Sequence, residues 1–81
     1  MNEGRNMKTK AHLKIDSRVH VLRAERRISQ QELAEAIGVT RATINAIEGG
    51  DYNPSLELAF RITRYFGVPL ENIFFVQEKR K

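Results

Sequence analysis

Residues 29–48 carry two helix-start signals and one helix-stop signal, which predict two short helices joined at a tight turn. Ser29 can accept a hydrogen bond from a free backbone N–H, and Glu32, three residues later, can complete a capping box. Gly38 can adopt the positive φ with which many helices end. This part of the chain therefore predicts a helix that begins at Gln30 and ends before Gly38.

A second helix is predicted directly after that stop. Thr40 is another favourable N-cap residue, so residues 41–48 should form a helix. Each of the two helices has apolar residues at helical spacing, and the two apolar faces should pack against each other. The residues on this shared seam are Leu33, Ala34, Ile37, Val39, Ile44 and Ile47.

The opposite face of the second helix is small and polar. Small side chains allow close approach to the DNA major groove, and Arg, Asn and Thr side chains can hydrogen-bond to base edges or phosphates. A solvated helical hairpin would carry the same cap pattern, so the pattern alone leaves both interpretations open. The outward residues are Ala42, Asn45 and Ala46, flanked by Arg41 and Thr43.

Three motifs extend the pattern: S-Q-x-E-L-A at 29–34, T-R-x-T-I-N-x-I-E at 40–48 and Y-N-P-S-L-x-L-A at 52–59. With these motifs residues 22–74, about two thirds of the chain, resemble the Cro/phage-repressor (XRE-type) family of DNA-binding domains. The resemblance implies a mainly α, five-helix fold of the lambda-repressor type. It is strongest to the small dimeric repressors of that family, such as the cytolysin-operon regulator, which add a short β-sheet.

The N-terminal part should contain a tail, a strand and a helix. Residues 1–10 are polar and lack periodicity, which predicts a disordered basic tail. Residues 11–15 alternate apolar and polar side chains, as in a short strand. Asp16 or Ser17 can cap a first helix that ends just before Ser29. Its core-facing residues would be Val19, Leu22 and Ile28, with Arg26 and Arg27 in solvent.

The C-terminal part should contain two helices. Ser55 can cap a fourth helix that begins near Leu56 and ends at Gly67. Pro69 then opens a shorter fifth helix that continues to about Ile73. The apolar face of the fourth helix comprises Leu58, Ala59, Ile62, Tyr65 and Phe66.

Residues 73–76 favour β-structure and form an apolar run that needs a partner. An isolated strand would be unstable, so we expect it to pair with residues 11–15 in a small antiparallel sheet. The alternative is that these aromatic residues only complete the core. In either case apolar surface remains exposed, which predicts a homodimer through Phe74, Phe75 and Val76.

Composition limits the remaining possibilities. Eighty-one residues, 41% of them apolar, suffice for one small domain, residues 11–78, followed by a basic tail at 79–81. There is no cysteine, and His12 and His20 lack metal-ligand spacing, so no metal or other cofactor is expected.

No catalytic motif is present, which argues against an enzyme. No apolar run is long enough to span a bilayer, so we expect a cytoplasmic protein without membrane contact.

Net charge contributes little to the DNA-binding prediction. The chain carries +4 overall, but residues 1–14 account for +3 and residues 77–81 for +2. Residues 15–76 therefore carry −1, and terminal basic runs are typical of solubilising tails. The prediction consequently depends on the motifs.

The family resemblance implies roles for particular residues. Gln30 and Gln31 would contact a phosphate at the start of their helix, or would simply be solvated there. Arg41 would hydrogen-bond to guanine or only to phosphate. Asn53 would contact the DNA backbone or only form the turn before Pro54. The full set of implied DNA contacts is Gln30, Gln31, Thr40, Arg41, Ala42, Thr43, Asn45, Tyr52 and Asn53.

The resemblance also implies a structural ion pair between Arg23 and Glu48, which would tie the first helix to the third. The expected function is a sequence-specific transcriptional regulator, usually a repressor in this family, with helix 40–48 in the major groove of a pseudo-palindromic operator. The alternative is an antitoxin or another interaction module that uses the same fold to mask a protein partner. The polar residues Arg41, Thr43 and Asn45 argue against a helix used only for protein contact.

Overall fold

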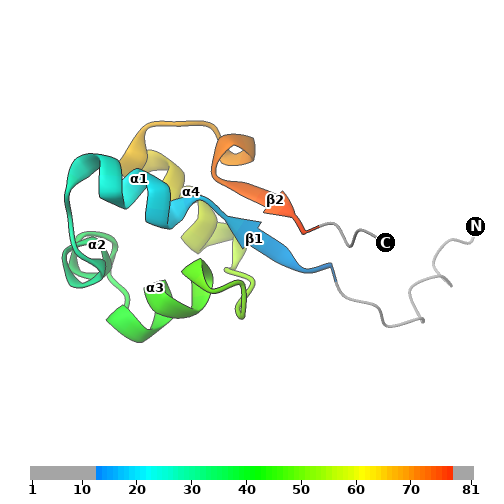
Figure 1. Cartoon of the computed structure of the whole chain (residues 1–81), viewed down its shortest axis with the longest axis horizontal. Helices are drawn as coiled ribbons and strands as arrows, with labels where there is room; N and C mark the ends of the chain where they lie inside the picture. Colours follow the sequence, from blue (N-terminus) through cyan, green and yellow to red (C-terminus); the bar gives the residue numbers. More distant parts are fainter. Residues whose placement is uncertain (1–12, 78–81) are drawn as a thin grey trace, which may run out of the picture.

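The computed structural model describes residues 13–77, and the predicted tails 1–10 and 79–81 lie outside them, as do Ala11 and His12 of the predicted strand. The described chain is mainly α-helical and has a small sheet at one end of the helical body (Figure 1). In chain order the elements are β1 (Ile15–Ser17), α1 (Val19–Arg26), α2 (Gln30–Ile37), α3 (Arg41–Glu48), α4 (Leu56–Phe66), the 3₁₀ turn η2 (Leu70–Asn72) and β2 (Phe74–Val76).

The starts of α2, α3 and α4 are confirmed, and each is capped by its predicted residue. Ser29 Oγ accepts from the Glu32 N–H at 2.9 Å, and the Glu32 carboxylate accepts from the Ser29 N–H at 2.7 Å, which completes the capping box. Thr40 and Ser55 accept from backbone N–H groups in the same way, at 3.2 and 3.1 Å. Gly38 ends α2 with φ of 80°, a conformation that glycine adopts without strain.

The predicted start of α1 is wrong. Asp16 and Ser17 belong to β1, so Arg18 takes the N-cap position, where its side chain makes no capping hydrogen bond. Pairing with β2 accounts for the difference, because Ser17 lies opposite Phe74 and is buried there. The Ser17 hydroxyl still accepts from the Val19 N–H at 3.4 Å, so Ser17 serves the start of the helix from its place in the strand.

Helix α1 also ends earlier than predicted. Arg27 has φ of 57° and is the one residue other than glycine with positive φ within residues 13–77. The N–H groups of Arg27 and Ile28 donate to the carbonyls of Ala24 and Arg23 at 3.1 and 3.2 Å. This left-handed ending redirects the chain so that Ile28 packs at the edge of the core.

The predicted fifth α-helix is wrong, so the described chain has four α-helices. The segment after Pro69 forms a single 3₁₀ turn, in which Asn72 and Ile73 donate to carbonyls three residues earlier, both at 2.9 Å. Ile73 is fully buried, and the chain becomes extended at Phe74. Too few residues lie between Pro69 and this anchor for a series of i→i+4 hydrogen bonds.

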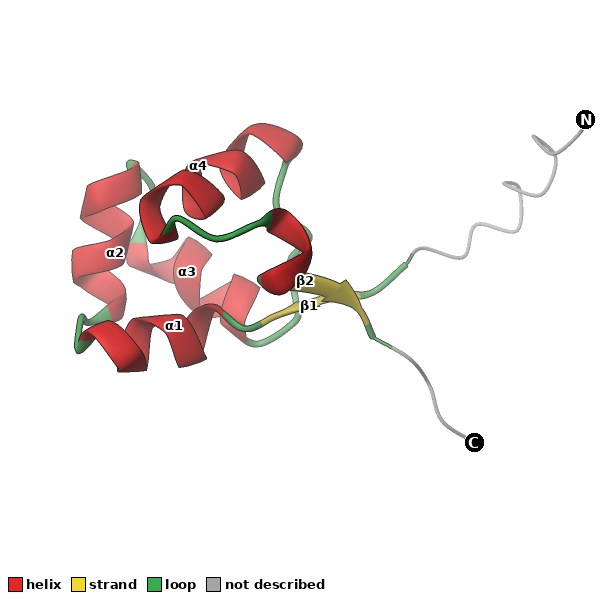
Figure 2. Cartoon of the chain, turned by 90° about the horizontal axis from the view of Figure 1, so that it is seen from above, coloured by secondary structure: helices red, strands yellow, loops and turns green. Residues whose placement is uncertain are grey.

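The predicted antiparallel sheet is confirmed, but its first strand lies at 15–17 rather than 11–15. Both strands lie beside η2 and the start of α1 (Figure 2). Because strand residues alternate between faces, Asp16 and Phe75 share one face of the sheet. Ile15, Ser17, Phe74 and Val76 share the other, in the register Ile15↔Val76, Asp16↔Phe75 and Ser17↔Phe74.

The core lies between the helices and consists of the predicted apolar positions. Its fully buried large side chains come from α1, α2, α3, α4 and the residue before β2. Leu22, Ile28, Val39 and Tyr65 pack at its edge and are half-buried. The core residues are Val19, Leu33, Ala34, Ile37, Ile44, Ile47, Leu58, Ile62, Phe66 and Ile73.

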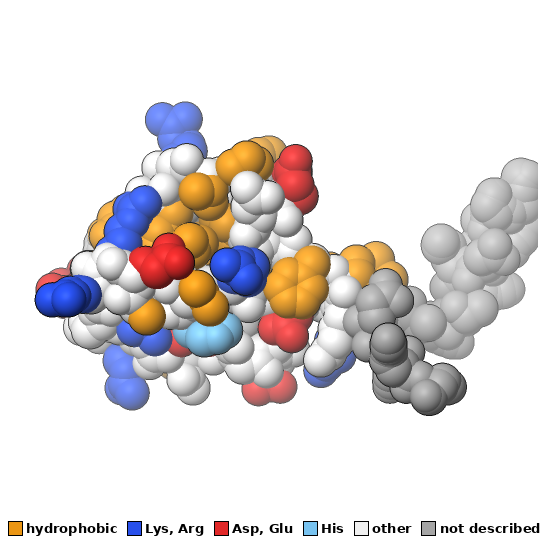
Figure 3. Space-filling model, turned by 45° about the horizontal axis from the view of Figure 1, so that its top comes forward, with side chains coloured by type: hydrophobic (Ala, Val, Ile, Leu, Met, Phe, Trp, Pro, Cys, Tyr) orange, Lys and Arg blue, Asp and Glu red, His pale blue; other side chains and the backbone are white. Residues whose placement is uncertain are grey.

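Several large apolar side chains remain on the surface. Figure 3 shows apolar side chains among single charged ones on one face of the helical body. Further apolar side chains lie towards the end of the molecule that carries the sheet. Phe75 is 46% exposed and Val76 39% exposed. No helix within residues 13–77 has the length and apolar content needed to cross a membrane. The remaining exposed large apolar residues are Leu13, Tyr52, Leu56 and Phe60.

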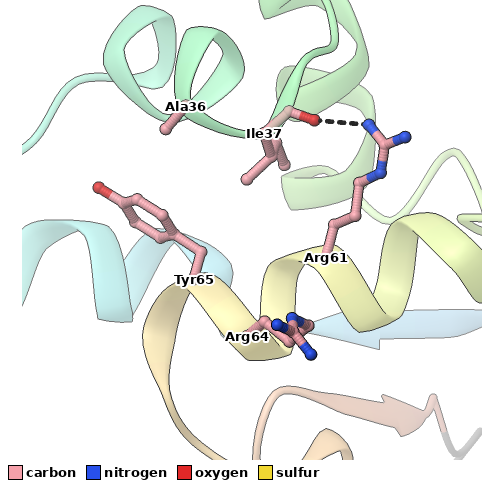
Figure 4. A pocket seen from close by; sticks show the side chains of 5 residues that line it. All are labelled: Ala36, Ile37, Arg61, Arg64 and Tyr65. Atoms are coloured by element: carbon pink, nitrogen blue, oxygen red, sulfur yellow. Dashed lines mark hydrogen bonds between the residues drawn. The ribbon is translucent and has the colours of Figure 1, made fainter.

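Two arginines satisfy the C-terminal carbonyl groups of other helices. Arg61 of α4 donates to the Ile37 carbonyl at the end of α2 at 2.9 Å (Figure 4). Arg26 of α1 donates to the Phe66 carbonyl at the end of α4 at 2.6 Å, and its guanidinium lies over the Phe66 ring. Helix-end carbonyls have no partner within their own helix, so these contacts join α1, α2 and α4.

Candidate nucleic-acid interface

Helix α3 presents a polar, narrow face to solvent because its two large apolar residues point inward. Ile44 and Ile47 are buried in the core, and α3 packs against α2 and α1. Arg41, Ala42 and Asn45 are exposed on the other side. Thr43 and Ala46 lie half-buried at the margins of that face, so the predicted outward set shares one side of the helix.

Gln30, the first residue of α2, connects its helix to α3. Its Nε2 donates to Asn45 Oδ1 at 3.2 Å and to Glu48 Oε1 at 3.0 Å. Its Oε1 accepts from Arg41 Nε at 3.4 Å. The side chain that was expected to contact phosphate or solvent therefore also joins both ends of α3.

Arg23 and Glu48 form a two-point ion pair between α1 and α3. Arg23 Nε lies 2.7 Å from Glu48 Oε2, and Arg23 Nη2 donates to Glu48 Oε1 at 3.0 Å. Arg23 Nη1 also donates to the Ile28 carbonyl at 3.0 Å. The side chains are only 20% and 10% exposed, so water screens the pair less than an ordinary surface pair.

The pair shifts the acid–base equilibrium of both groups. Burial of the Glu48 carboxylate favours its neutral form, but hydrogen bonds from Arg23 and Gln30 and the charge of Arg23 outweigh burial. The pKa of Glu48 therefore lies below its ordinary value. The hydrogen bond to Glu48 likewise raises the pKa of Arg23. Both groups are charged at neutral pH.

The remaining predicted residues lie outside this network. Gln31 Nε2 donates to Glu35 on its own helix at 2.8 Å, and Thr40 Oγ1 lies 3.1 Å from Thr43 Oγ1. Tyr52, in the loop after α3, is exposed.

Asn53 has a structural role that the sequence did not predict. Its Oδ1 accepts from the Ile15 N–H at 3.3 Å, and its Nδ2 donates to the Leu13 carbonyl at 3.1 Å. These are the hydrogen bonds that a neighbouring strand would supply, so Asn53 fixes the chain entering β1. Asn53 and Leu13 are about forty positions apart in the chain. The sequence alone does not reveal that these two segments lie together, so this role of Asn53 could not be predicted from it.

The residues predicted for dimerisation lie together in β2, at the opposite end of the molecule from the turn between α2 and α3 (Figure 1). Phe74 packs against the core, whereas Phe75 and Val76 are exposed. Within residues 13–77 no group of His, Asp or Glu side chains could hold a metal ion.

This arrangement, a capped helix, a glycine turn and a second capped helix with a polar outer face, defines a helix-turn-helix domain. Comparison with known families agrees: residues 20–73 match the helix-turn-helix family HTH_3. The chain belongs to this family, of XRE (Cro/C1) type, which comprises transcriptional regulators and not enzymes.

Similar proteins occur in archaea and bacteria. The chain is 50% identical over 56 residues to the uncharacterized HTH-type transcriptional regulator MJ0272 of Methanocaldococcus jannaschii, covering 69% of this chain and 85% of that protein. It is 46% identical over 63 residues to the regulator YgzD of Bacillus subtilis, covering 78% and 96%.

Two further similarities are more distant. The cryptic phage CTXphi transcriptional repressor RstR of Vibrio cholerae is 37% identical over 57 residues, covering 70% of this chain and 51% of RstR. A crystal structure of a protein from Bacteroides fragilis superimposes with a TM-score of 0.67 at 23% identity, covering 75% of this chain and 98% of that one. This last similarity concerns the fold alone.

Proposed function

We propose that this protein is a sequence-specific DNA-binding transcriptional repressor that acts in the cytoplasm as a two-fold dimer. Helix α3 of each protomer enters the major groove at one half-site of a pseudo-palindromic operator. The observation that carries the proposal is the outer face of α3, where Arg41 and Asn45 offer hydrogen-bonding groups beside the small side chain of Ala42. A helix with such a face can approach base edges closely.

Contacts to the DNA backbone would position this helix. The N-terminus of α2 carries free N–H groups and the two glutamines Gln30 and Gln31, which can donate to a phosphate. Thr40 and Thr43 flank the groove-facing side chains. Tyr52 offers an exposed hydroxyl on the loop after α3, whereas the amide of Asn53 is already used by the entry to β1.

Dimerisation would involve the end of the molecule that carries the sheet. Phe75 and Val76 leave apolar area in water, and β2 has a second edge that pairs with no other strand within residues 13–77, whereas Asn53 occupies the outer edge of β1. Beside them an open apolar groove of about 320 Å³ is lined by residues of the sheet, of α4, of η2 and of the loop before α4. A second copy seated on this end of the molecule would cover the groove and Val76, which lie on one face of the sheet, and would reach around β2 to Phe75. The residues that line the groove are Ile15, Pro54, Leu56, Ala59, Leu70 and Phe74.

Repression is the regulatory outcome that the similarity to RstR favours, since that relative is named as a transcriptional repressor. A dimer bound at a promoter would exclude polymerase from it. The relatives from Methanocaldococcus jannaschii and Bacillus subtilis carry the broader description of transcriptional regulators.

Selection of bound sequences from a pool of random duplexes tests this function. We expect enrichment of an inverted repeat whose half-sites are centred about 10 base pairs apart, or a multiple of that, since successive major grooves on one face are about 34 Å apart. Ala42→Glu should abolish enrichment, because it places a carboxylate in the groove. Ala36→Glu, the same change at an exposed position of α2 facing α4, should not. Absence of any enriched sequence would refute DNA recognition and favour a protein partner.

A further inference from the structure

The described chain has no excess of positive charge, so the placement of its cations matters. Residues 13–77 contain seven arginines and one lysine, balanced by eight acidic residues. Arg23 and Arg61 form ion pairs, Arg26 donates to the end of α4, and Arg41 donates to Gln30. The basic side chains that make no hydrogen bond or ion pair within residues 13–77 are Lys14, Arg18, Arg27 and Arg64.

Arg27 lies between α1 and α2, where both helices are joined to α3. It follows Arg23 by four positions, about one helical turn, so it extends the side of α1 from which Arg23 reaches Glu48. The next residue, Ile28, packs at the edge of the core, and its carbonyl accepts from Arg23 at 3.0 Å. The backbone at Arg27 is therefore tied to the ion pair between α1 and α3, while its own side chain is exposed.

The fold itself does not require a cation at this position. Helix α1 already has Arg23 and Arg26 in its last turn, where positive charge stabilises a helix end. Arg27 also has φ of 57°, which glycine would adopt at lower cost. The guanidinium of Arg27 is thus free to serve a partner.

Lys14 lies on the other side of α3, beside the loop that follows this helix. Its two neighbours are both bonded to Asn53, which donates to the Leu13 carbonyl at 3.1 Å and accepts from the Ile15 N–H at 3.3 Å. The strand that begins at Ile15 contacts α3. Lys14 is exposed and, with Tyr52 of that loop, lines an open depression of about 380 Å³.

Acidic side chains close to these two cations do not pair with them. Asp51 lines the depression beside Lys14, but the two form no ion pair. The carboxylates of Asp16 and Glu32 accept from backbone N–H groups of their own segments. Lys14 and Arg27 therefore keep their charges available for an anionic partner.

We infer that Arg27 and Lys14 contact DNA phosphates on the two sides of α3 and supply much of the electrostatic affinity for DNA. This inference rests on the proposed DNA-binding function. Arg41 is the one basic residue of α3 itself, and a helix in the major groove lies between two phosphate backbones. Guanidinium and ammonium groups both donate to phosphate oxygens.

Salt titration of DNA affinity with matched variants tests this inference. The logarithm of the binding constant falls with the logarithm of salt concentration, with a slope of about −0.9 for each phosphate neutralised. Arg27→Gln and Lys14→Gln each remove one charge. Arg18→Gln and Arg64→Gln are the controls, since these two exposed cations line depressions that include no residue of α3. Circular dichroism confirms that each variant is folded.

Each of Arg27→Gln and Lys14→Gln should make the slope shallower by about 0.9 for every bound protomer. Affinity should fall by the same factor on the selected operator and on a random duplex, because phosphates are present in every sequence. The two control variants should leave the slope unchanged.

Three results would overturn the inference. One is an unchanged slope in either Arg27→Gln or Lys14→Gln. Another is an equal change in the controls, which would mean that only total charge matters. The third is a loss confined to the operator, which would indicate contact with a base. Failure of the proposed function looks different, because then the parent protein enriches no sequence from the random pool.

Discussion

The Glu48 side chain accepts three hydrogen bonds, two from Arg23 and one from Gln30. We predict that Glu48→Gln lowers the free energy of unfolding by about 1–3 kcal/mol, because it leaves the largely buried Arg23 guanidinium without its counter-ion. Urea denaturation of parent and variant measures the difference. A variant as stable as the parent would show that the pair contributes nothing to the fold.

The same pair predicts a pH dependence of known sign. A carboxylate whose pKa is lower in the folded state stabilises the fold above its unfolded pKa, and this stabilisation disappears as pH falls through the folded value. The ordinary pKa of glutamate is 4.5, and that of Glu48 lies below it. The stability difference between parent and Glu48→Gln should therefore be complete at pH 7 and shrink below about pH 4.5. A difference that stays constant down to pH 3 would contradict the assignment.

Arg27 offers a test of backbone strain. A left-handed conformation, φ of 57° here, is unfavourable for a residue with a β-carbon and accessible to glycine. Arg27→Gly should raise the free energy of unfolding by about 0.5–1 kcal/mol in thermal or urea denaturation. Arg64→Gly removes the same charge from within α4, where glycine should destabilise by about 1 kcal/mol. Equal effects at both positions would show that the Arg27 backbone is not strained.

At the scale of elements, α2, α3 and α4 were predictable because their signals are local. Ser29, Thr40 and Ser55 each satisfy an N–H three residues away, so sequence spacing is sufficient information. The start of α1 and the fifth helix were mispredicted because tertiary contacts decide them. Ser17 pairs with Phe74, and burial of Ile73 limits the preceding segment to one 3₁₀ turn.

The interface shows the same division between local and distant information. Helical periodicity was enough to assign the outward face of α3, including Arg41 and Asn45. The direction of the Gln30 and Asn45 amides was not predictable, because it depends on a carboxylate that a third helix holds in place. Likewise, Arg26 is exposed as expected, but the hydrogen bond of its guanidinium to the end of α4, forty residues away, was not predictable.

At the scale of the whole molecule, the exposed half of β2 should mediate a dimer. We predict that the double variant Phe75→Gln/Val76→Gln is a monomer, because it makes the apolar surface polar while leaving the packed Phe74 in place and adding no like charge opposite Asp16. Sedimentation at micromolar concentration measures this. Its affinity for a full operator should fall towards that for a half-site, since the second binding event is no longer linked to the first.

Two results would refute the dimer. One is a parent protein that sediments as a monomer at micromolar concentration. The other is a double variant that remains folded, by its thermal transition, and binds the full operator as tightly as the parent does. In either case no dimer would hold two α3 helices at a fixed spacing, so the predicted paired half-sites would have no physical explanation.

The central claim is that the outer face of α3 contacts bases, and Arg41→Ala tests it most directly. The measurement is the dissociation constant, at one salt concentration, for the selected operator and for a random duplex, with Arg64→Ala as the control for removed charge. We predict that Arg41→Ala weakens operator binding by roughly 1–3 kcal/mol more than random-duplex binding, whereas Arg64→Ala changes the two equally. Equal losses on both duplexes would show that Arg41 contacts only phosphate, and no loss on either would remove Arg41 from the interface; both results would contradict base recognition through this residue.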